Sequence, residues 1–230
     1  MTHDSVAAAP VRVLIADDEA MVRAGVRSIL ETDAAIEVVA EAGDGREAVE
    51  LARRHRPGVA LLDIRMPVLD GLEAARQITI LVPETRVLVL TTFGDDAHVE
   101  RALTSGAAGF LLKASDPREL ITGVHAVADG AAYLSPRIAQ RVIAHYRDGS
   151  RGDRAQAQLR IDLLSGRELD VLALLGTGLS NHQIARRLHL VEGTVKGHVS
   201  AILTKLDAHN RVQAAVLAHR AGLAPVADHR

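Results

Sequence analysis

Five short apolar runs alternate with five amphipathic stretches over the first 130 residues of the chain. The apolar runs have the length of buried strands and lie at 11–16, 36–42, 59–63, 86–92 and 108–113. Apolar residues recur at helical spacing in the stretches 19–30, 44–55, 69–80, 95–104 and 116–128. Strands that are apolar on both faces and alternate with helices form parallel sheets. We therefore expect a doubly wound five-stranded parallel sheet with helices on both faces.

The pattern changes after residue 130. Residues 131–162 are expected to form a helical linker, with one helix near 135–148 and a polar stretch at 149–163. Residues 163–224 are expected to form a second, smaller all-α domain. Three of its helices begin with the N-terminal boxes Ser165-x-x-Glu168, Ser180-x-x-Gln183 and Asn210-x-x-Gln213. A fourth helix, at 192–206, follows Val191 and therefore lacks a capping side chain.

Composition narrows the class of protein. The chain has no cysteine, which excludes disulfides and thiolate metal sites, and it has neither an apolar run of membrane-spanning length nor a basic leader. We therefore expect a cytoplasmic protein without a membrane partner. Residues 11–129 carry 13 basic and 20 acidic residues, whereas 130–230 carry 14 and 8. This asymmetry favours a cation or basic protein as partner of the first part, and a polyanion as partner of the second.

Acidic residues follow the first and third apolar runs. In a doubly wound sheet, ligands bind outside the carboxyl ends of the strands. The residues expected at this edge are Asp17, Asp18, Asp63, Thr91 and Lys113. Three converging carboxylates repel one another unless a cation is present, and Mg²⁺ prefers oxygen ligands of this kind. The remaining carboxylate could then attack a phosphoryl group, whose oxygens Lys113 and Thr91 would bind.

The helix at 192–206 has one apolar and one small, polar face. Val195, Val199, Ile202, Leu203 and Leu206 form the apolar stripe, and Gly193, Lys196, Gly197, Ser200 and Thr204 lie opposite. A small, polar face fits the DNA major groove. Lys196 is therefore expected to contact a base or a phosphate, and Ser200 and the Gly197 backbone to contact base edges. The residues expected to contact phosphates are Ser180, Asn181, Thr194 and Lys205.

Other interpretations remain open at this point. Asp17 and Asp18 are also suitable helix caps, and Asp63 a turn residue. An aspartyl-phosphate phosphatase would use the same nucleophile, but it needs a second acid two residues later, where this chain has Arg65. A further alternative is a regulatory protein that makes no use of phosphate and in which the acidic cluster has no function. The small face of the last helix, formed by Val212, Ala215, Val216 and His219, suits either pairing between two chains or core packing.

Longer stretches resemble known families. "IADDEAMVRAGVRSIL", "LLDIRMPVLDG", "LTTF" and "GAAGFLLKAS" are similar to a response-regulator receiver domain, which has a flavodoxin-like fold. "LSGRELDVLALLGTGLSNHQIARRLHLVEGTVKGHVSAILTKL" resembles a LuxR-type helix-turn-helix domain. A receiver domain at 11–130 followed by a LuxR-type domain at 163–224 is the NarL/FixJ arrangement of a two-component regulator.

The resemblance implies a function and a set of roles. A sensor histidine kinase would phosphorylate Asp63, with Asp18, Asp63 and the Arg65 backbone carbonyl as Mg²⁺ ligands and Asp17 acting through water. Phe110 would be the aromatic switch residue. Phosphorylation would promote a homodimer that binds promoter DNA, with RNA polymerase as a further partner, and the protein would not be an enzyme. The chain departs from the receiver pattern at Ala114, where proline is common, and at Phe110, where tyrosine is frequent.

Two positions bear on the lifetime of the phosphorylated state. Hydrolysis of an acyl phosphate needs a water held in line with the phosphorus, and a nearby carboxylate or carboxamide usually orients it. The positions two residues beyond Asp63 and Thr91 are Arg65 and Phe93. Arginine offers only donors and phenylalanine excludes water, so slow dephosphorylation is expected.

Overall fold

The computed structural model describes residues 9–92, 105–135, 138, 158–208 and 210–223. In this part of the chain, parallel strands form one sheet in the order β2-β1-β3-β4-β5-β6. They are β1 (Val11–Ala16), β2 (Ile36–Ala42), β3 (Val59–Asp63), β4 (Arg86–Thr91), β5 (Gly109–Leu112) and β6 (Tyr133–Leu134). The order turns around at β1, since β2 lies on one side of it and β3 on the other. A ligand crevice is therefore expected between the ends of β1 and β3.

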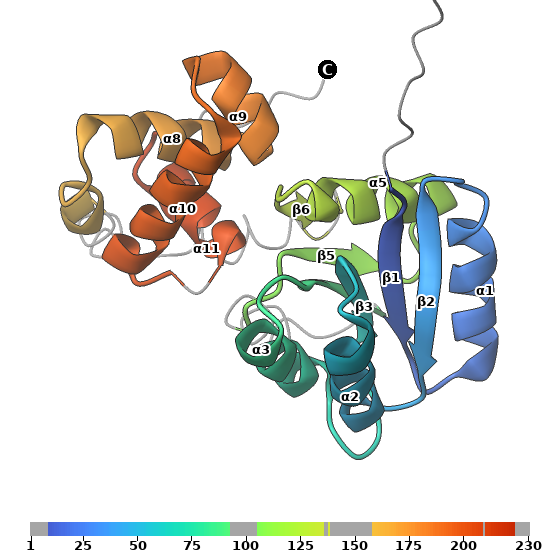
Figure 1. Ribbon diagram of the computed structural model, residues 1–230. Helices are drawn as coiled ribbons and strands as arrows, with labels where there is room; N and C mark the ends of the chain where they lie inside the picture. The colour runs from blue at the N-terminus through green and yellow to red at the C-terminus, as the bar shows by residue number, and fades with distance from the viewer. Residues whose placement is uncertain (1–8, 93–104, 136–137, 139–157, 209, 224–230) are drawn as a thin grey trace, which may run out of the picture.

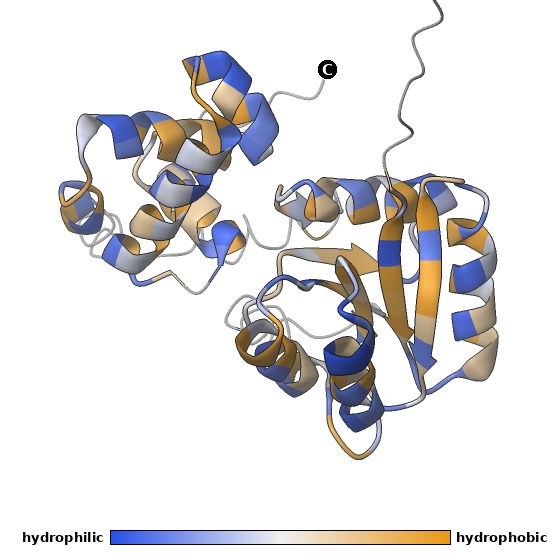
Figure 2. Ribbon diagram, in the orientation of Figure 1, coloured by the Kyte–Doolittle hydropathy of each residue, from blue (hydrophilic) through white to orange (hydrophobic). Residues whose placement is uncertain are grey.

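Helices cover both faces of the sheet (Figure 1). Helices α1 (Ala20–Leu30) and α5 (Pro117–Ala128) pack together on one face, and α2 (Gly45–His55) and α3 (Gly71–Leu81) on the other. Val13 and Ile15 of β1 belong to the core under α1 and α5, whereas Leu14 belongs to the core under α2 and α3. Burial on both faces explains why the inner strands are mainly apolar, whereas the edge strand β2 also has hydrophilic positions (Figure 2).

The sheet has one strand more than the five expected. β6 pairs with β5 in parallel, so the sheet continues to Leu134, into the range predicted to be linker. Gly130, with φ of 81°, turns the chain after α5, and Gly109 permits the close approach of β6 because a Cβ there would lie 2.6 Å from the Tyr133 carbonyl oxygen. A strand of two residues is too short to show a periodicity. The helix expected at 95–104 and most of the one at 135–148 lie outside the described residues.

Helices form the second domain, as expected. They are α8 (Gly166–Gly176), α9 (Asn181–Leu188), α10 (Glu192–Leu206) and α11 (Arg211–Arg220). Fully buried residues from the first three of these helices form a common core: Val171, Leu172, Leu175, Ile184, Val195, Ile202 and Leu206. The capping boxes at Ser165 and Ser180 are present, and the Asn210 side chain accepts from the backbone of Gln213. Val191 provides no side-chain cap for α10, in agreement with the sequence.

The two domains are in contact through α11. Val212, which is 1% exposed, belongs to the same apolar cluster as Ile138 and Phe110 of β5. Arg211 donates a hydrogen bond of 2.8 Å from Nη1 to the carbonyl oxygen of Gly130. The last helix therefore packs against the first domain in this structure. Among the described residues, no helix has both the length and the apolar character needed to cross a bilayer.

Candidate functional site

Three carboxylates meet where β1 and β3 end. Asp17, Asp18 and Asp63 each offer an oxygen, and these oxygens lie within 4.8 Å of one another. Asp17 and Asp63 are 1% and 5% exposed, while Asp18 is open to solvent. The backbone amide of Glu19 donates to Asp17 Oδ1 at 3.0 Å, which fixes that side chain. The sequence prediction that these residues converge is consistent with this geometry.

Lys113 closes the carboxylate cluster. Its Nζ lies 2.7 Å from Asp17 Oδ2 and 3.0 Å from Asp63 Oδ2. Burial alone lowers the pKa of Lys113, but the hydrogen bonds and charges of the two aspartates outweigh it, so the pKa is raised. Burial raises the pKa of Asp63, although the contact with Lys113 opposes this shift. The pocket therefore holds a carboxylate that is partly desolvated and a lysine that stays charged.

The cluster fits a divalent cation. Three carboxylates face one lysine, so the group has two negative charges in excess even with Lys113 protonated. Two of the three carboxylates are shielded from water, which increases their mutual repulsion. Hard oxygen ligands and excess negative charge match the requirements of Mg²⁺.

The start of α3 packs closely against the backbone of Asp63. A Cβ at Gly71 would lie 1.8 Å from the Asp63 carbonyl oxygen, so only glycine fits there. The Gly71 amide donates to the Ile64 carbonyl at 2.9 Å, and Asp70 caps α3 by accepting from the Glu73 amide at 2.8 Å. In a sequence, an Asp-Gly pair indicates a turn. Its second role, the close approach of α3 to the end of β3, depends on the tertiary structure.

The other expected pocket residues lie on neighbouring strands. Thr91 is the last residue of β4 and donates from its hydroxyl to the Thr92 carbonyl at 3.0 Å. Its backbone carbonyl accepts from the Lys113 amide at 2.8 Å. Phe110 is 3% exposed and lies in the core, paired with Leu134 of β6. Arg65 has an exposed side chain in the loop after Asp63. Thr91 thus ends the strand next to β3, and the side chains of Thr91 and Phe110 make their contacts outside the carboxylate cluster.

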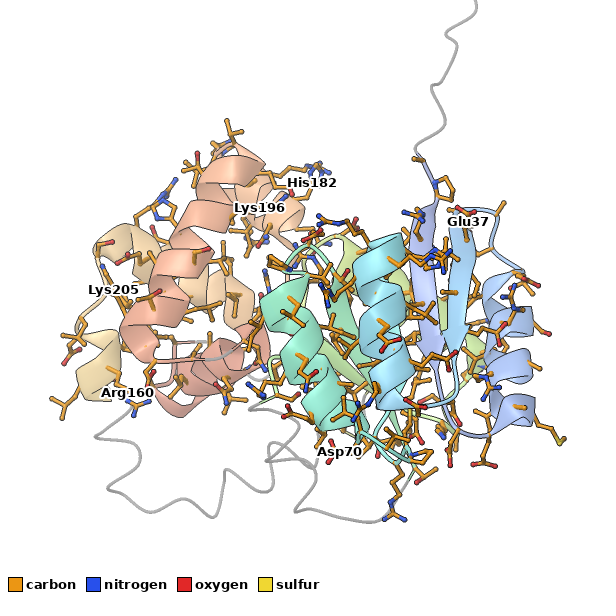
Figure 3. The ribbon with its side chains drawn as sticks, turned by 60° about the horizontal axis from the view of Figure 1, so that its bottom comes forward. Glu37, Asp70, Arg160, His182, Lys196 and Lys205 are labelled. Carbon is orange, nitrogen blue, oxygen red and sulfur yellow. The ribbon has the colours of Figure 1, made fainter. Side chains whose placement is uncertain are left out.

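The second candidate surface is the outer face of α10. Lys196, Gly197, Ser200 and Thr194 are exposed, and the opposite stripe is buried or half-buried in the domain core. Nothing lies within 4 Å of the Cβ positions that Gly193 and Gly197 would have. Lys196 and His182 lie near one another, away from Lys205 further along the domain (Figure 3). The face expected to read DNA is therefore open and carries little bulk.

Two of the four candidate phosphate contacts are buried, whereas Thr194 and Lys205 are exposed. Ser180 and Asn181, at the start of α9, are 7% and 4% exposed. Asn181 Oδ1 accepts from Arg211 Nη1 at 2.6 Å, and Arg211 also donates to the Leu179 carbonyl. Lys205 Nζ lies 2.7 Å from Glu168 Oε2 of α8. In this arrangement these groups bind other parts of the chain.

Sequence reasoning missed one charged residue on the α10 surface. Glu192, the first residue of α10, lies 3.0 Å from Lys196 Nζ through its Oε1. The signal was the spacing of four residues between an acid and a base on one helix, which favours an ion pair.

Comparisons with known proteins agree with this division of the chain. The model for the response regulator receiver domain matches residues 13–125, and that for bacterial regulatory proteins of the luxR family matches 162–218. Transcriptional regulatory protein DegU of Brevibacillus brevis is 38% identical over 216 residues, which cover 90% of this chain and 92% of that protein. Transcriptional regulatory protein LiaR of Bacillus subtilis (strain 168) is 40% identical over 210 residues, covering 91% and 97%.

Solved structures of response regulators are also similar to this chain. The response regulator ChrA of a heme-sensing two-component system is 34% identical, covers 93% of this chain and 98% of its own, and superposes with a TM-score of 0.53. The receiver domain of the response regulator NarL from Mycobacterium tuberculosis is 43% identical, covers 53% and 98%, and gives a TM-score of 0.52.

Proposed function

Because the chain belongs to the two-component response regulators that join a receiver domain to a LuxR-type DNA-binding domain, we propose that phosphorylation of Asp63 by a sensor histidine kinase controls its dimerisation and its binding to promoter DNA. The observation that carries the proposal is the contact of Lys113 with both Asp17 and Asp63 at the end of β3. Asp63 is the carboxylate at the strand end, and Asp17 and Asp18 remain beside it for a cation.

The chemistry follows from the charges in the pocket. A carboxylate oxygen of Asp63 forms a bond to phosphorus while the nitrogen–phosphorus bond of the kinase phosphohistidine breaks, and the imidazole leaves neutral because its second nitrogen carries a proton. Lys113 pairs with the transferred phosphoryl oxygens, and the Thr91 hydroxyl turns from the Thr92 carbonyl to donate to them. Mg²⁺ held by Asp18, Asp63 and the Arg65 carbonyl, with Asp17 acting through water, would neutralise charge on those oxygens.

Phosphorylation of Asp63 would affect DNA binding by weakening the contact between the two domains. Ser180 and Asn181 would hold DNA phosphates, yet they are buried in the docked arrangement. DNA binding therefore requires α9 and α11 to leave the receiver, and a phosphoryl group at Asp63 would favour the separated form. Val212 and Val216, which cover the receiver here, would then be free to pair with a second chain.

The phosphorylation step is tested by intact mass. Wild type incubated with acetyl phosphate and Mg²⁺ is expected to gain one phosphoryl group, and Asp63→Asn to gain none. Asp170→Asn, which removes an exposed carboxylate from α8, is the control and should be modified like wild type. A phosphoryl adduct of equal yield on Asp63→Asn would contradict the proposal.

The DNA contact is tested on the same proteins. In the proposed complex Lys196, Gly197 and Ser200 face base edges, Thr194 and Lys205 join Ser180 and Asn181 at phosphates, and RNA polymerase is a further partner at the promoter. Phosphorylated wild type should bind its selected DNA site more tightly than Asp63→Asn treated alike. Lys196→Ala should lose about 1–3 kcal/mol of binding free energy at fixed salt, with unchanged helicity. Equal affinity would show that another face enters the groove.

A further inference from the structure

A carboxylate, Glu192, lies on the outer face of α10, the surface proposed to contact DNA. Glu192 is the first residue of α10, and its side chain is 38% exposed. Its Oε1 lies 3.0 Å from Lys196 Nζ, and its Oε2 lies 3.8 Å from His182 Nδ1 of α9. The N-terminal residues of a recognition helix are those that reach base edges when the helix enters the major groove. Glu192 therefore lies beside the candidate base contact Lys196.

The role of Glu192 in folding is small. An acidic residue in the first turn of a helix and an exposed ion pair at a spacing of four residues each contribute only some tenths of a kcal/mol. Against DNA, however, a carboxylate repels phosphates and neutralises part of the Lys196 charge, so it weakens binding to any sequence. The repulsion is offset only where a base donates a hydrogen bond to the carboxylate.

The major groove offers few such donors. Guanine presents two acceptors and thymine presents an acceptor and a methyl group, while the adenine amino group stands beside an acceptor, N7. Cytosine presents its amino group, which suits a carboxylate. Lys196, one turn further along the same face, has only donors and suits guanine O6 and N7.

We propose that Glu192 is a specificity-determining residue that accepts a hydrogen bond from a cytosine amino group, beside a guanine that Lys196 contacts. The inference rests on the proposed function, because it requires α10 to lie in the major groove. The hydrogen bond from Lys196, followed by the charges of His182 and Arg86, holds the pKa of Glu192 below its ordinary value. The acceptor is therefore ionised at neutral pH, as its pairing with a donor requires.

The charge of Arg86 also interacts with that of Glu192. Arg86 belongs to β4 of the receiver, so a change at Glu192 also alters the attraction between the docked domains. A shift between docked and separated forms changes the apparent affinity for every DNA sequence by the same factor. Only the ratio of affinities between sequences reports on a contact in the groove.

The experiment compares such ratios. Phosphorylated full-length wild type is used to select a site from random double-stranded DNA, and each base pair of the site is then replaced in turn and titrated at fixed salt. Wild type is expected to lose about tenfold in affinity when one C·G pair of each half-site becomes A·T. Glu192→Gln should accept A·T at that position, because a glutamine amide pairs with adenine N6 and N7. Glu192→Ala should show no preference there.

The control is Asp170→Asn, which removes the same charge from an exposed position of α8 and should keep the wild-type order of sequences. An unchanged order of affinities for Glu192→Gln would overturn the inference while the proposed DNA binding stands. The inference would also fail if no C·G replacement affects wild type. If wild type selects no sequence at all, the proposed function fails together with it.

Discussion

Arg211 of α11 and Gly130 after α5 are joined by a hydrogen bond of 2.8 Å that links the DNA-binding domain to the receiver. The same guanidinium binds Asn181 Oδ1 and the Leu179 carbonyl, so one side chain holds the start of α9 and the receiver together. Arg211 is 7% exposed, and burial followed by the charge of Arg86 lowers its pKa to about 10. The contact therefore joins a buried cation to neutral acceptors, with a second arginine opposing it.

The apolar part of this interface gives the first prediction. Val212 is 1% exposed and packs into the receiver cluster rather than into the core of its own domain. Val212→Asp should disfavour the docked form by roughly 2 kcal/mol or more, because it would bury an unpaired charge. We expect a larger radius of gyration of the unphosphorylated protein by small-angle X-ray scattering. Thr204→Asp, on the exposed face of α10, should leave the radius unchanged. An unaltered radius for Val212→Asp would refute the docked arrangement.

The second prediction concerns the lifetime of the phosphorylated state. Arg65 is exposed next to Asp63 and has no acceptor with which to orient a water. Arg65→Asn keeps the backbone carbonyl, supplies a carboxamide, and should speed dephosphorylation by roughly tenfold. The phosphorylated fraction is followed by intact mass after the donor is removed, with Arg65→Lys as the control that retains a donor. Wild-type decay as fast as that of Arg65→Asn combined with Phe93→Glu would rule the explanation out.

A third prediction separates folding from function on α10. No neighbouring atom fills the position of a Cβ at Gly197, and an exposed helical glycine costs about 1 kcal/mol relative to alanine. Gly197→Ala should therefore raise the stability of the domain by up to about 1 kcal/mol in urea titrations. In the groove the added methyl group would meet the base edges, so DNA affinity should fall. The stability and DNA affinity of Gly193→Ala, at the start of the same face, are measured for comparison. A variant that is both more stable and unimpaired in binding would place Gly197 outside the interface.

The fourth prediction is a pH dependence. The hydrogen bond from Lys205, followed by that from the Ser165 amide, lowers the pKa of Glu168 to about 2. A depressed carboxyl pKa contributes stability above its unfolded value of about 4.5, and this contribution is lost as the pH falls towards 2. Melting temperatures of wild type and Glu168→Gln, followed by circular dichroism, should therefore differ at pH 6 and converge over about pH 4.5 to 2. A constant difference over this window would show that Lys205 does not pair with Glu168 in solution.

The sequence by itself determined the carboxylate site. Five apolar runs of strand length, each followed by a helical pattern, imply a parallel sheet, and parallel strands bring their carboxyl ends to one edge. Asp17, Asp63 and Lys113 therefore meet at this edge, and Lys113 Nζ lies within 3.0 Å of a carboxylate oxygen of each aspartate. The buried stripe of α10 was predictable for the same reason, since it depends on helical periodicity alone.

Only the tertiary structure decided which candidate side chains are exposed and which are buried or already paired with other parts of the chain. β6, the Arg211–Gly130 bond and the Lys205–Glu168 pair join residues far apart in the chain, and none leaves a periodic signal in the sequence. Ser180 and Asn181 look alike in sequence whether they face water or the receiver, yet here they are buried. Local pattern sets secondary structure because it acts through neighbouring residues. Docking depends on the shapes and charges of two finished surfaces, which exist only after each domain has folded.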